Sequence, residues 1–259
     1  MNFHFVAVSF VCVLALSQST KANVTVSSVQ EQIKFFTTRG SLSNLVAIEI
    51  TLEPLWTSDP SLYFQSNGQL IDAMATLSAS EPLALQEYEK QSRWVLSRKC
   101  PTNPPDASIC FNAKFQIAKH LVDSSPSSIS NAVVLAEFLG EVRTTIITNY
   151  HRAKFELNVM PPLTPTNANG MGYMSGMNPE SISDPVARAA YVKVLEENDR
   201  RREINEFQIN TLPEINRTMT LQFFYYISRL SEKETMTKKQ AVDLATSAHL
   251  SEEEQQRLQ

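Results

Sequence analysis

Apolar residues recur at steps of three and four along most of the chain, which is the spacing of one helix face. The clearest stripe lies between Ile129 and Leu157, and its members are Leu135, Leu139, Val142, Ile146, Tyr150, Ala153 and Leu157. Gly140 interrupts the stripe, and a glycine costs a helix about 1 kcal/mol relative to alanine unless a close helix crossing offsets it. The pattern predicts one long helix between Pro126 and Pro161.

Shorter stripes upstream predict further helices. One begins at Pro82 and ends before Cys100, and the next follows Cys110 and reaches Val122. The segment 46–52 alternates apolar and polar residues as a strand does, but its flanks look helical, so we expect helix there too.

The last third of the chain also carries helix signals. Asp184 is a suitable N-cap with Pro185 at the first helical position, and Pro213 is expected to open a further helix that reaches Leu230. Two capping boxes predict short helices in the tail, Thr237 with Gln240 and Ser251 with Glu254.

The stretch 196–203 has no apolar face. Its opposite charges stand four residues apart, in the pairs Glu196 with Arg200 and Glu197 with Arg201. This arrangement is typical of a solvent-exposed helix.

Composition agrees with a helical fold. Only 6 of 259 residues are glycine, which disfavours a turn-rich β fold, and 42% are apolar, which is enough to build a core. The predicted fold class is all-α: a helical bundle with a Pro/Gly/Met-rich loop and a C-terminal helical arm. The expected organisation is a signal peptide at 1–22, an N-terminal helical region at 23–160, a linker or long loop at 161–183 and a C-terminal helical region at 184–259.

The apolar run from Phe5 to Leu16 predicts a secretory signal peptide. It is too short to span a bilayer, and Thr20 and Ala22 place small side chains where a signal peptidase cleaves. We therefore expect cleavage near Ala22 and export to the periplasm or the extracellular space. No later stretch has membrane-spanning length, so we expect no transmembrane segment in the mature chain.

Two cysteines follow the predicted signal, Cys100 and Cys110. In an oxidising compartment this pair predicts a disulfide, and closing a loop of this size contributes about 3 kcal/mol on the chain-entropy model. The prolines between them predict an irregular connector rather than helix. The alternative, a redox or metal pair, has little support because the spacing is far from C-x-x-C.

Three methionines, Met171, Met174 and Met177, follow one another at intervals of three within the glycine-containing loop. Thioether sulfur is a soft ligand that suits Cu(I), so this loop is a candidate metal site and Cu(I) the alternative cofactor; no other cofactor is predicted. The other interpretation is that the methionines are adaptable apolar contacts. A net charge of −4 without a basic block argues against a nucleic-acid partner.

Catalytic signatures are weak. His120 with Asp123 could form an acid/base pair on one helix face, and a hydrolase site between helices around His120 or His151 is an alternative function. The chain contains no G-x-S-x-G, P-loop or G-x-G-x-x-G motif, so we predict no catalytic residue.

The densest aromatic cluster is Phe223, Phe224, Tyr225 and Tyr226. Four consecutive residues cover most of a helix circumference, so they predict either a helix buried on two sides or an exposed patch for a protein partner or self-association. Asn23 and Asn216 begin N-glycosylation sequons, which matter only in a eukaryotic host.

The run from Met177 to Tyr191, followed by the charged helix, resembles a segment of uncharacterised exported helical proteins of planctomycete-type bacteria. The resemblance covers about a quarter of the chain. It implies an extracytoplasmic bacterial setting, in which the sequons have no role, and it assigns no activity. Taken together, the sequence predicts an exported, soluble helical binding or scaffold protein that acts through helix surfaces, and favours this role over that of an enzyme.

Overall fold

The computed structural model describes residues 26–102, 104–125, 127–158 and 177–256. Within these ranges the secondary structure is helical and contains no strand, so the all-α prediction is confirmed. The chain forms two compact units, one of residues 1–144 with 215–259 and the other of residues 145–214. The predicted signal peptide and most of the predicted 161–183 loop lie outside the described residues, so those boundaries stay predictions.

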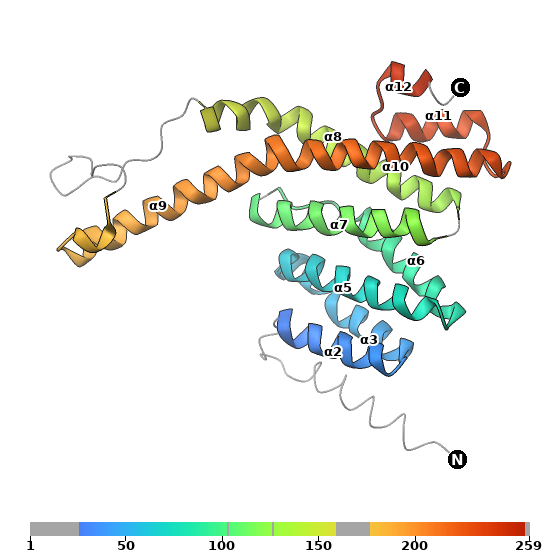
Figure 1. The fold of residues 1–259 in the computed structure, drawn as a ribbon, viewed down its shortest axis with the longest axis horizontal. Coiled ribbons are helices and arrows are strands. Elements are labelled where there is room, and N and C mark those ends of the chain that lie inside the picture. The colour runs from blue at the N-terminus through green and yellow to red at the C-terminus, as the bar shows by residue number, and fades with distance from the viewer. Residues whose placement is uncertain (1–25, 103, 126, 159–176, 257–259) are drawn as a thin grey trace, which may run out of the picture. The chain divides into compact units, whose positions relative to one another are not determined.

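The first unit is a stack of helix pairs (Figure 1). Its helices are α2 (Val26–Thr38), α3 (Leu42–Leu52), α4 (Leu55–Ser58), α5 (Pro60–Ser78), α6 (Pro82–Ser97), α7 (Pro104–Ser124), the first half of α8 (Ile129–Asn158), most of α10 (Leu212–Glu232), α11 (Lys238–Ser247) and α12 (Glu252–Gln256). Helix α5 packs against α2, α3, α6 and α7, and its fully buried Phe64, Leu70, Ile71 and Met74 form the centre of the core.

Helix α10 closes the stack on α7 and α8. The Tyr226 hydroxyl accepts hydrogen bonds from the backbone N–H of Ser128 and from the Asn131 amide, both at 3.0 Å. The Arg229 guanidinium donates to the carbonyl of Val122, also at 3.0 Å. These bonds join the beginning of α8 and the last turn of α7 to a segment about a hundred residues further along the chain.

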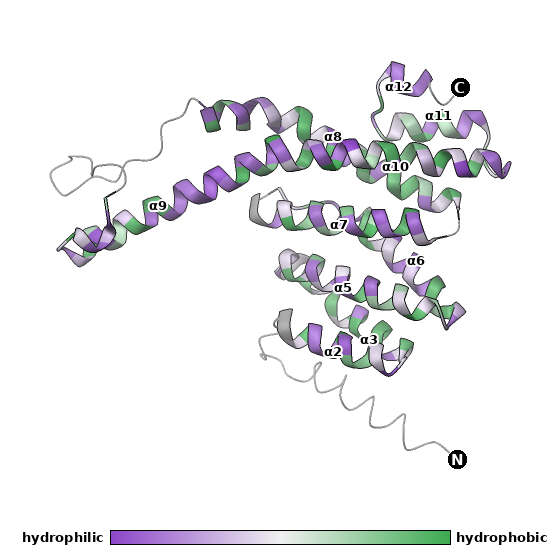
Figure 2. Cartoon of the chain, viewed as in Figure 1, coloured by the Kyte–Doolittle hydropathy of each residue, from purple (hydrophilic) through white to green (hydrophobic). Residues whose placement is uncertain are grey.

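The second unit contains the end of α8 and α9 (Pro185–Glu206), which is preceded by a short 3-10 turn, η1 (Pro179–Ser181). Asp184 caps α9 as predicted, since its carboxylate accepts the N–H of Val186 at 3.0 Å. Figure 2 shows that α9 is mostly hydrophilic. Its ion pairs differ from those predicted: Arg200 pairs with Glu197, and Arg202 with Glu206, at 2.8 Å each.

One predicted helix boundary next to a proline is wrong, and the helix predicted from Pro213, α10, begins at Leu212 but directly continues a preceding helix. Helix α7 begins at Pro104, before Cys110, because prolines fit the first turn of a helix, where the missing N–H would have no partner. Pro213 does not open a separate helix. A π-helical turn, η2 (Phe207–Thr211), joins α9 to α10, and the N–H of Leu212 bonds to the carbonyl of Phe207 five residues earlier, so the changed bonding accommodates the proline.

The Cys100–Cys110 disulfide is formed, with an S–S distance of 2.01 Å. Because Cys110 lies inside α7, the bridge ties the connector after α6 to the body of the next helix. The connector itself is short, since the residues from Pro104 onward are already helical.

Gly140 lies at a close crossing of α8 and α11, the arrangement that can offset the cost of a glycine within a helix. A Cβ atom placed on Gly140 would stand 2.4 Å from the carbonyl oxygen of Ser247. Both capping boxes are also present: Thr237 with Gln240 opens α11, and Ser251 with Glu254 opens α12. Within the described ranges, no helix combines the length and apolarity needed to cross a bilayer.

Arg143 connects α8 to the C-terminal helices. Its guanidinium forms two hydrogen bonds of 2.7 Å with the two carboxylate oxygens of Glu254, and further bonds to the Thr220 hydroxyl and the His249 carbonyl. Planar two-pronged pairing of this kind is among the stronger ionic contacts in proteins. The hydrogen bonds from Arg143 lower the pKa of Glu254 to about 2.

This pair predicts an acid-dependent loosening of the C-terminal helices. A carboxylate whose pKa is depressed in the folded state contributes stability above its ordinary pKa of about 4.3, and that contribution is lost as the pH falls through about 2. The protection of α11 and α12 against hydrogen exchange, taken relative to the intrinsic exchange rate at each pH, should therefore decrease in the wild type between these values. A Glu254→Gln variant should already exchange faster at neutral pH and should lack the acid-dependent step; a step of equal size in both proteins would contradict the assignment.

Candidate functional site

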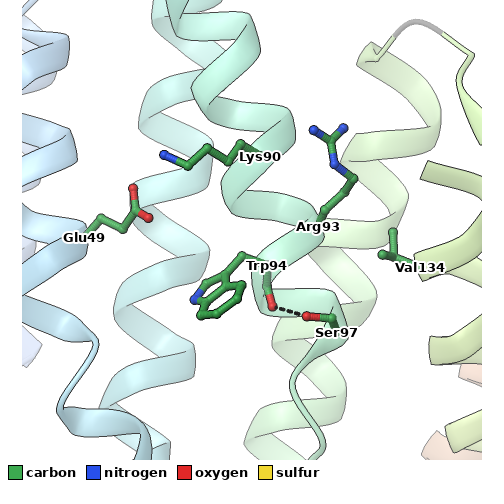
Figure 3. Close-up of a pocket in the computed structure, with 6 residues that line it drawn as sticks. All are labelled: Glu49, Lys90, Arg93, Trp94, Ser97 and Val134. Carbon is green, nitrogen blue, oxygen red and sulfur yellow. Dashed lines mark hydrogen bonds between the residues drawn. The ribbon is translucent and has the colours of Figure 1, made fainter. Parts of the chain in front are cut away.

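An open groove of about 500 Å³ lies on one face of the first unit (Figure 3). Helix α6 forms its floor, and α3 and α8 stand on either side. Most of its lining surface belongs to apolar atoms, including the aliphatic parts of charged side chains. The residues that line it are Glu49, Lys90, Arg93, Trp94, Ser97 and Val134. The groove therefore combines three helices that are distant in the sequence.

The two faces of α6 explain how the groove is built. Tyr88, Ser92 and Val95 are buried, and they lie on the side of α6 that packs on the core. Lys90, Trp94 and Ser97 follow one another at steps of four and three, so they share the other side. One helix thus fills the core and supplies most of the groove.

Trp94 is the aromatic centre of the groove. Its side chain is 45% exposed, although its indole N–H donates to a carboxylate oxygen of Glu53 at 3.1 Å. The guanidinium of Arg98 lies 4.1 Å from the centroid of the Trp94 ring, 5.4 Å from that of Trp56, and pairs with Glu53. Cation–π contacts hold such rings in place. Trp94 is therefore fixed in orientation while much of its surface stays open.

Glu49 stands on the α3 side of the groove and points toward α6 (Figure 3). Burial raises the pKa of its carboxyl group, and the nearby Lys90 opposes this increase. One of its oxygens, Oε2, is shielded from solvent and receives no hydrogen bond from the described residues. A shielded carboxylate oxygen without a donor is energetically costly, which makes Glu49 the unsatisfied polar group of the groove.

A second cluster lies beside the disulfide. The Lys114 ammonium, only 1% exposed, donates to Glu141 at 2.5 Å and to the carbonyl of Arg98 at 2.7 Å. The other oxygen of Glu141 accepts the N–H of Cys100 at 2.6 Å. Desolvation lowers the pKa of Lys114, and Glu141 opposes that effect. Both members of the pair also bond to the backbone next to the disulfide, at Arg98 and Cys100, so we interpret it as a structural ion pair.

Two of the three methionines of the predicted soft-metal loop, Met171 and Met174, lie outside the described residues. For Met177 the structure shows a backbone contact, in which its carbonyl accepts the Tyr191 hydroxyl at 3.0 Å. Cu(I) binding by these methionines stays a prediction. Among the described residues, no group of three or more His, Cys, Asp or Glu side chains could hold a metal ion.

His120 and His151 lie in different surroundings. The ion pair of His120 is with Asp72 of α5, at 3.7 Å, rather than with Asp123 one turn away on its own helix. His151 is exposed and lies edge-on to Tyr150, with 5.7 Å between the ring centroids. A hydrolase site around either residue stays a prediction.

The aromatic cluster of α10 is divided between core and surface. Phe223 and Tyr226 are fully buried, Phe224 is half-buried, and Tyr225 is 57% exposed with the Arg229 guanidinium 5.5 Å from its ring centroid. Use of the exposed part for a partner or for self-association stays a prediction.

The sequon at Asn216 lies inside α10, and the Asn216 side-chain oxygen is shielded from solvent. Oligosaccharide transfer needs an accessible, extended acceptor, so production in eukaryotic cells should leave Asn216 unmodified. Intact-mass measurement of the secreted protein before and after N-glycan removal checks this. A glycan located on Asn216 by peptide mapping would contradict this prediction.

The groove was not predicted from the sequence because its residues do not form a local motif. Lys90 and Trp94 do not disturb the helical spacing of the apolar residues around them, so they resemble ordinary surface residues of an amphipathic helix. The usable signal was the placement of a tryptophan on the polar side of α6, since large aromatic residues usually face the core.

No protein-family model, curated protein or solved structure matches the chain. The resemblance of the segment Met177–Tyr191 to exported planctomycete-type proteins therefore stays a prediction.

Proposed function

We propose that this protein is an exported binding or scaffold protein that holds a segment of a partner protein in the groove of α3, α6 and α8. The observation that carries the proposal is the exposed but rigidly held Trp94 on the groove floor. Partly buried tryptophans of this kind are enriched among the residues that dominate protein interfaces. A groove of about 500 Å³ accommodates a few side chains of an extended segment.

Export is the second part of the proposal. It is supported by the signal-like apolar run from Phe5 to Leu16 and by the Cys100–Cys110 disulfide, since such bonds persist mainly in oxidising compartments. A protein that works outside the cytoplasm without a cofactor motif fits a role in binding other chains.

Site-specific photocrosslinking in the native host tests the proposal. A benzoylphenylalanine replaces Ser97 in the groove, and a control protein carries it at the exposed Lys119 of α7. We expect a discrete adduct from position 97 that is absent from position 119 and disappears when Trp94→Ala is added. Equal labelling from both positions, or an adduct that survives the loss of Trp94, would contradict the proposal.

A further inference from the structure

We propose that the partner segment presents a basic side chain beside an aliphatic one, with the basic group on the Glu49 carboxylate and the aliphatic group on Trp94. This inference rests on the proposed function and names the chemistry of its partner. It starts from the shielded Oε2 of Glu49, which lacks a hydrogen-bond donor among the described residues. Rotation of the Glu49 side chain would turn this oxygen into the groove, where an incoming guanidinium or ammonium would supply the missing donor and neutralise the carboxylate.

The chain itself shows the same arrangement one helical turn away. Glu53, four residues after Glu49, pairs with the Arg98 guanidinium, which stacks 4.1 Å from the centroid of the Trp94 ring. A carboxylate of the α3 segment and the Trp94 indole thus already hold one cation together. Glu49 lines the groove together with Trp94, but among the described residues no cation pairs with its carboxylate as Arg98 pairs with that of Glu53.

The basic residues of the groove are engaged with other groups. Lys90 pairs with Glu87 at 2.8 Å, and its side chain is 57% exposed. Arg93 donates to the side-chain oxygen of Asn131 at 2.8 Å and lies 3.6 Å from Glu89. Glu53 and Glu87 add negative potential at Glu49, and Lys90 is the cation that opposes it. Lys90 is therefore the internal competitor of an incoming basic side chain.

The groove also suits the neighbour of that basic residue. Its surface is largely apolar, with Trp94 on the floor and Val134 of α8 on the far side (Figure 3). An aliphatic side chain next to the basic one would cover the open face of the indole and gain burial there. The net charge of −4 would in addition favour the approach of a basic segment.

Selection from a random dodecapeptide library displayed on phage tests this inference. The full-length protein is the bait. The library is first depleted on the Trp94→Ala variant, so that peptides that bind outside the groove are removed. We expect enriched peptides that contain Arg or Lys adjacent to Leu, Ile or Val. Their affinities are then measured with synthetic peptides on variants whose fold has been checked by circular dichroism.

Three variants distinguish the contribution of the basic group on Glu49 from that of the rest of the groove. Glu49→Gln should weaken binding of an enriched basic peptide about tenfold, the effect of losing one charge-assisted hydrogen bond. Lys90→Gln should strengthen it about threefold, because the competing cation is gone. Glu31→Gln, which removes an exposed carboxylate of α2, is the control and should change nothing.

The outcomes distinguish this inference from the proposed function. Enrichment of peptides without a basic residue, or basic peptides that bind Glu49→Gln as well as the wild type, would overturn the cation assignment and leave the groove as a peptide site. No enrichment relative to Trp94→Ala would overturn both.

Discussion

Replacing Glu141 with leucine is expected to lower the free energy of unfolding by about 3–5 kcal/mol, because it leaves the Lys114 ammonium buried without its counter-ion. Lys114 is 1% exposed, so water cannot take the place of the lost carboxylate. The N–H of Cys100 also loses its acceptor. Urea-induced unfolding with the disulfide intact measures the change.

A double variant shows whether the cost comes from the unpaired charge. Lys114→Met combined with Glu141→Leu removes both ions and keeps apolar volume in the core, so it should recover most of the lost stability. The carbonyl of Arg98 still loses a donor, which limits the recovery. If Glu141→Leu alone costs no more than an ordinary surface substitution, about 0.5 kcal/mol, the pair has no structural role.

The pH dependence of the single variant gives an independent check. Burial depresses the pKa of Lys114, so the folded state binds this proton less tightly than the unfolded state does. Stability must then rise with pH from the depressed value up to the ordinary lysine pKa of about 10.4. Glu141→Leu removes the group that opposes the depression, so its stability should increase more steeply than that of the wild type between neutral pH and pH of about 10.

Local signals predicted the helices well where they depend on neighbouring residues. The stripe from Ile129 to Leu157 became a single helix that ends one residue later, at Asn158. The capping boxes and the N-cap at Asp184 also have the expected hydrogen bonds, because each bond joins residues within one helical turn. The close approach of α11 to Gly140 supplies the compensation that a glycine in a helix interior can have, although the sequence did not show which helix would provide it.

The effect of a proline depends on its position within the helix, and a sequence pattern does not show that position. Pro104 and Pro213 both occur where a helix was expected to stop or start anew, yet the first lies in a helix N-terminal turn and the second follows a π-helical turn that changes the hydrogen bonding. The sequence carries no local mark of the π turn.

The candidate site was beyond local reasoning for a different reason. Glu49, Trp94 and Val134 come from three helices, and only the packing of α3 and α8 beside α6 makes a groove of them. The partner of Lys114 is likewise set by tertiary packing, since Glu141 is 27 residues away. Lys114 lies on the buried stripe of α7, since Phe111 and Ala118, one turn before and after it, are buried too. A lysine at such a position can still extend its ammonium to solvent, so the stripe alone does not predict the buried ion pair.

Replacing Gly140 with alanine is expected to destabilise the first unit by about 1–2 kcal/mol, although alanine is the better helix former. The new Cβ would stand 2.4 Å from the carbonyl oxygen of Ser247, and a backbone atom cannot move without shifting α11. At so short a distance we expect an overpacking cost in the upper part of the usual range, about 2–3 kcal/mol, which exceeds the propensity gain of about 1 kcal/mol by about 1–2 kcal/mol.

Gly68 of α5 provides the matched control. A Cβ at Gly68 would meet no atom within 4 Å, so Gly68→Ala should keep the propensity gain and stabilise the protein by about 1 kcal/mol. The same chemical change is thus expected to have opposite signs at the two positions. Thermal unfolding of the two variants measures both, and a stabilising Gly140→Ala would show that α11 does not pack closely on α8.

Hydrogen exchange then locates the damage caused by Gly140→Ala. Arg143 follows Gly140 by three residues and holds Glu254 and the His249 carbonyl, so a shift of α11 should also weaken these bonds. We expect faster exchange in α11 and α12, while α5 and α6 keep the wild-type protection. Uniformly faster exchange in all of these helices would instead mean that the C-terminal helices unfold only together with the rest of the unit.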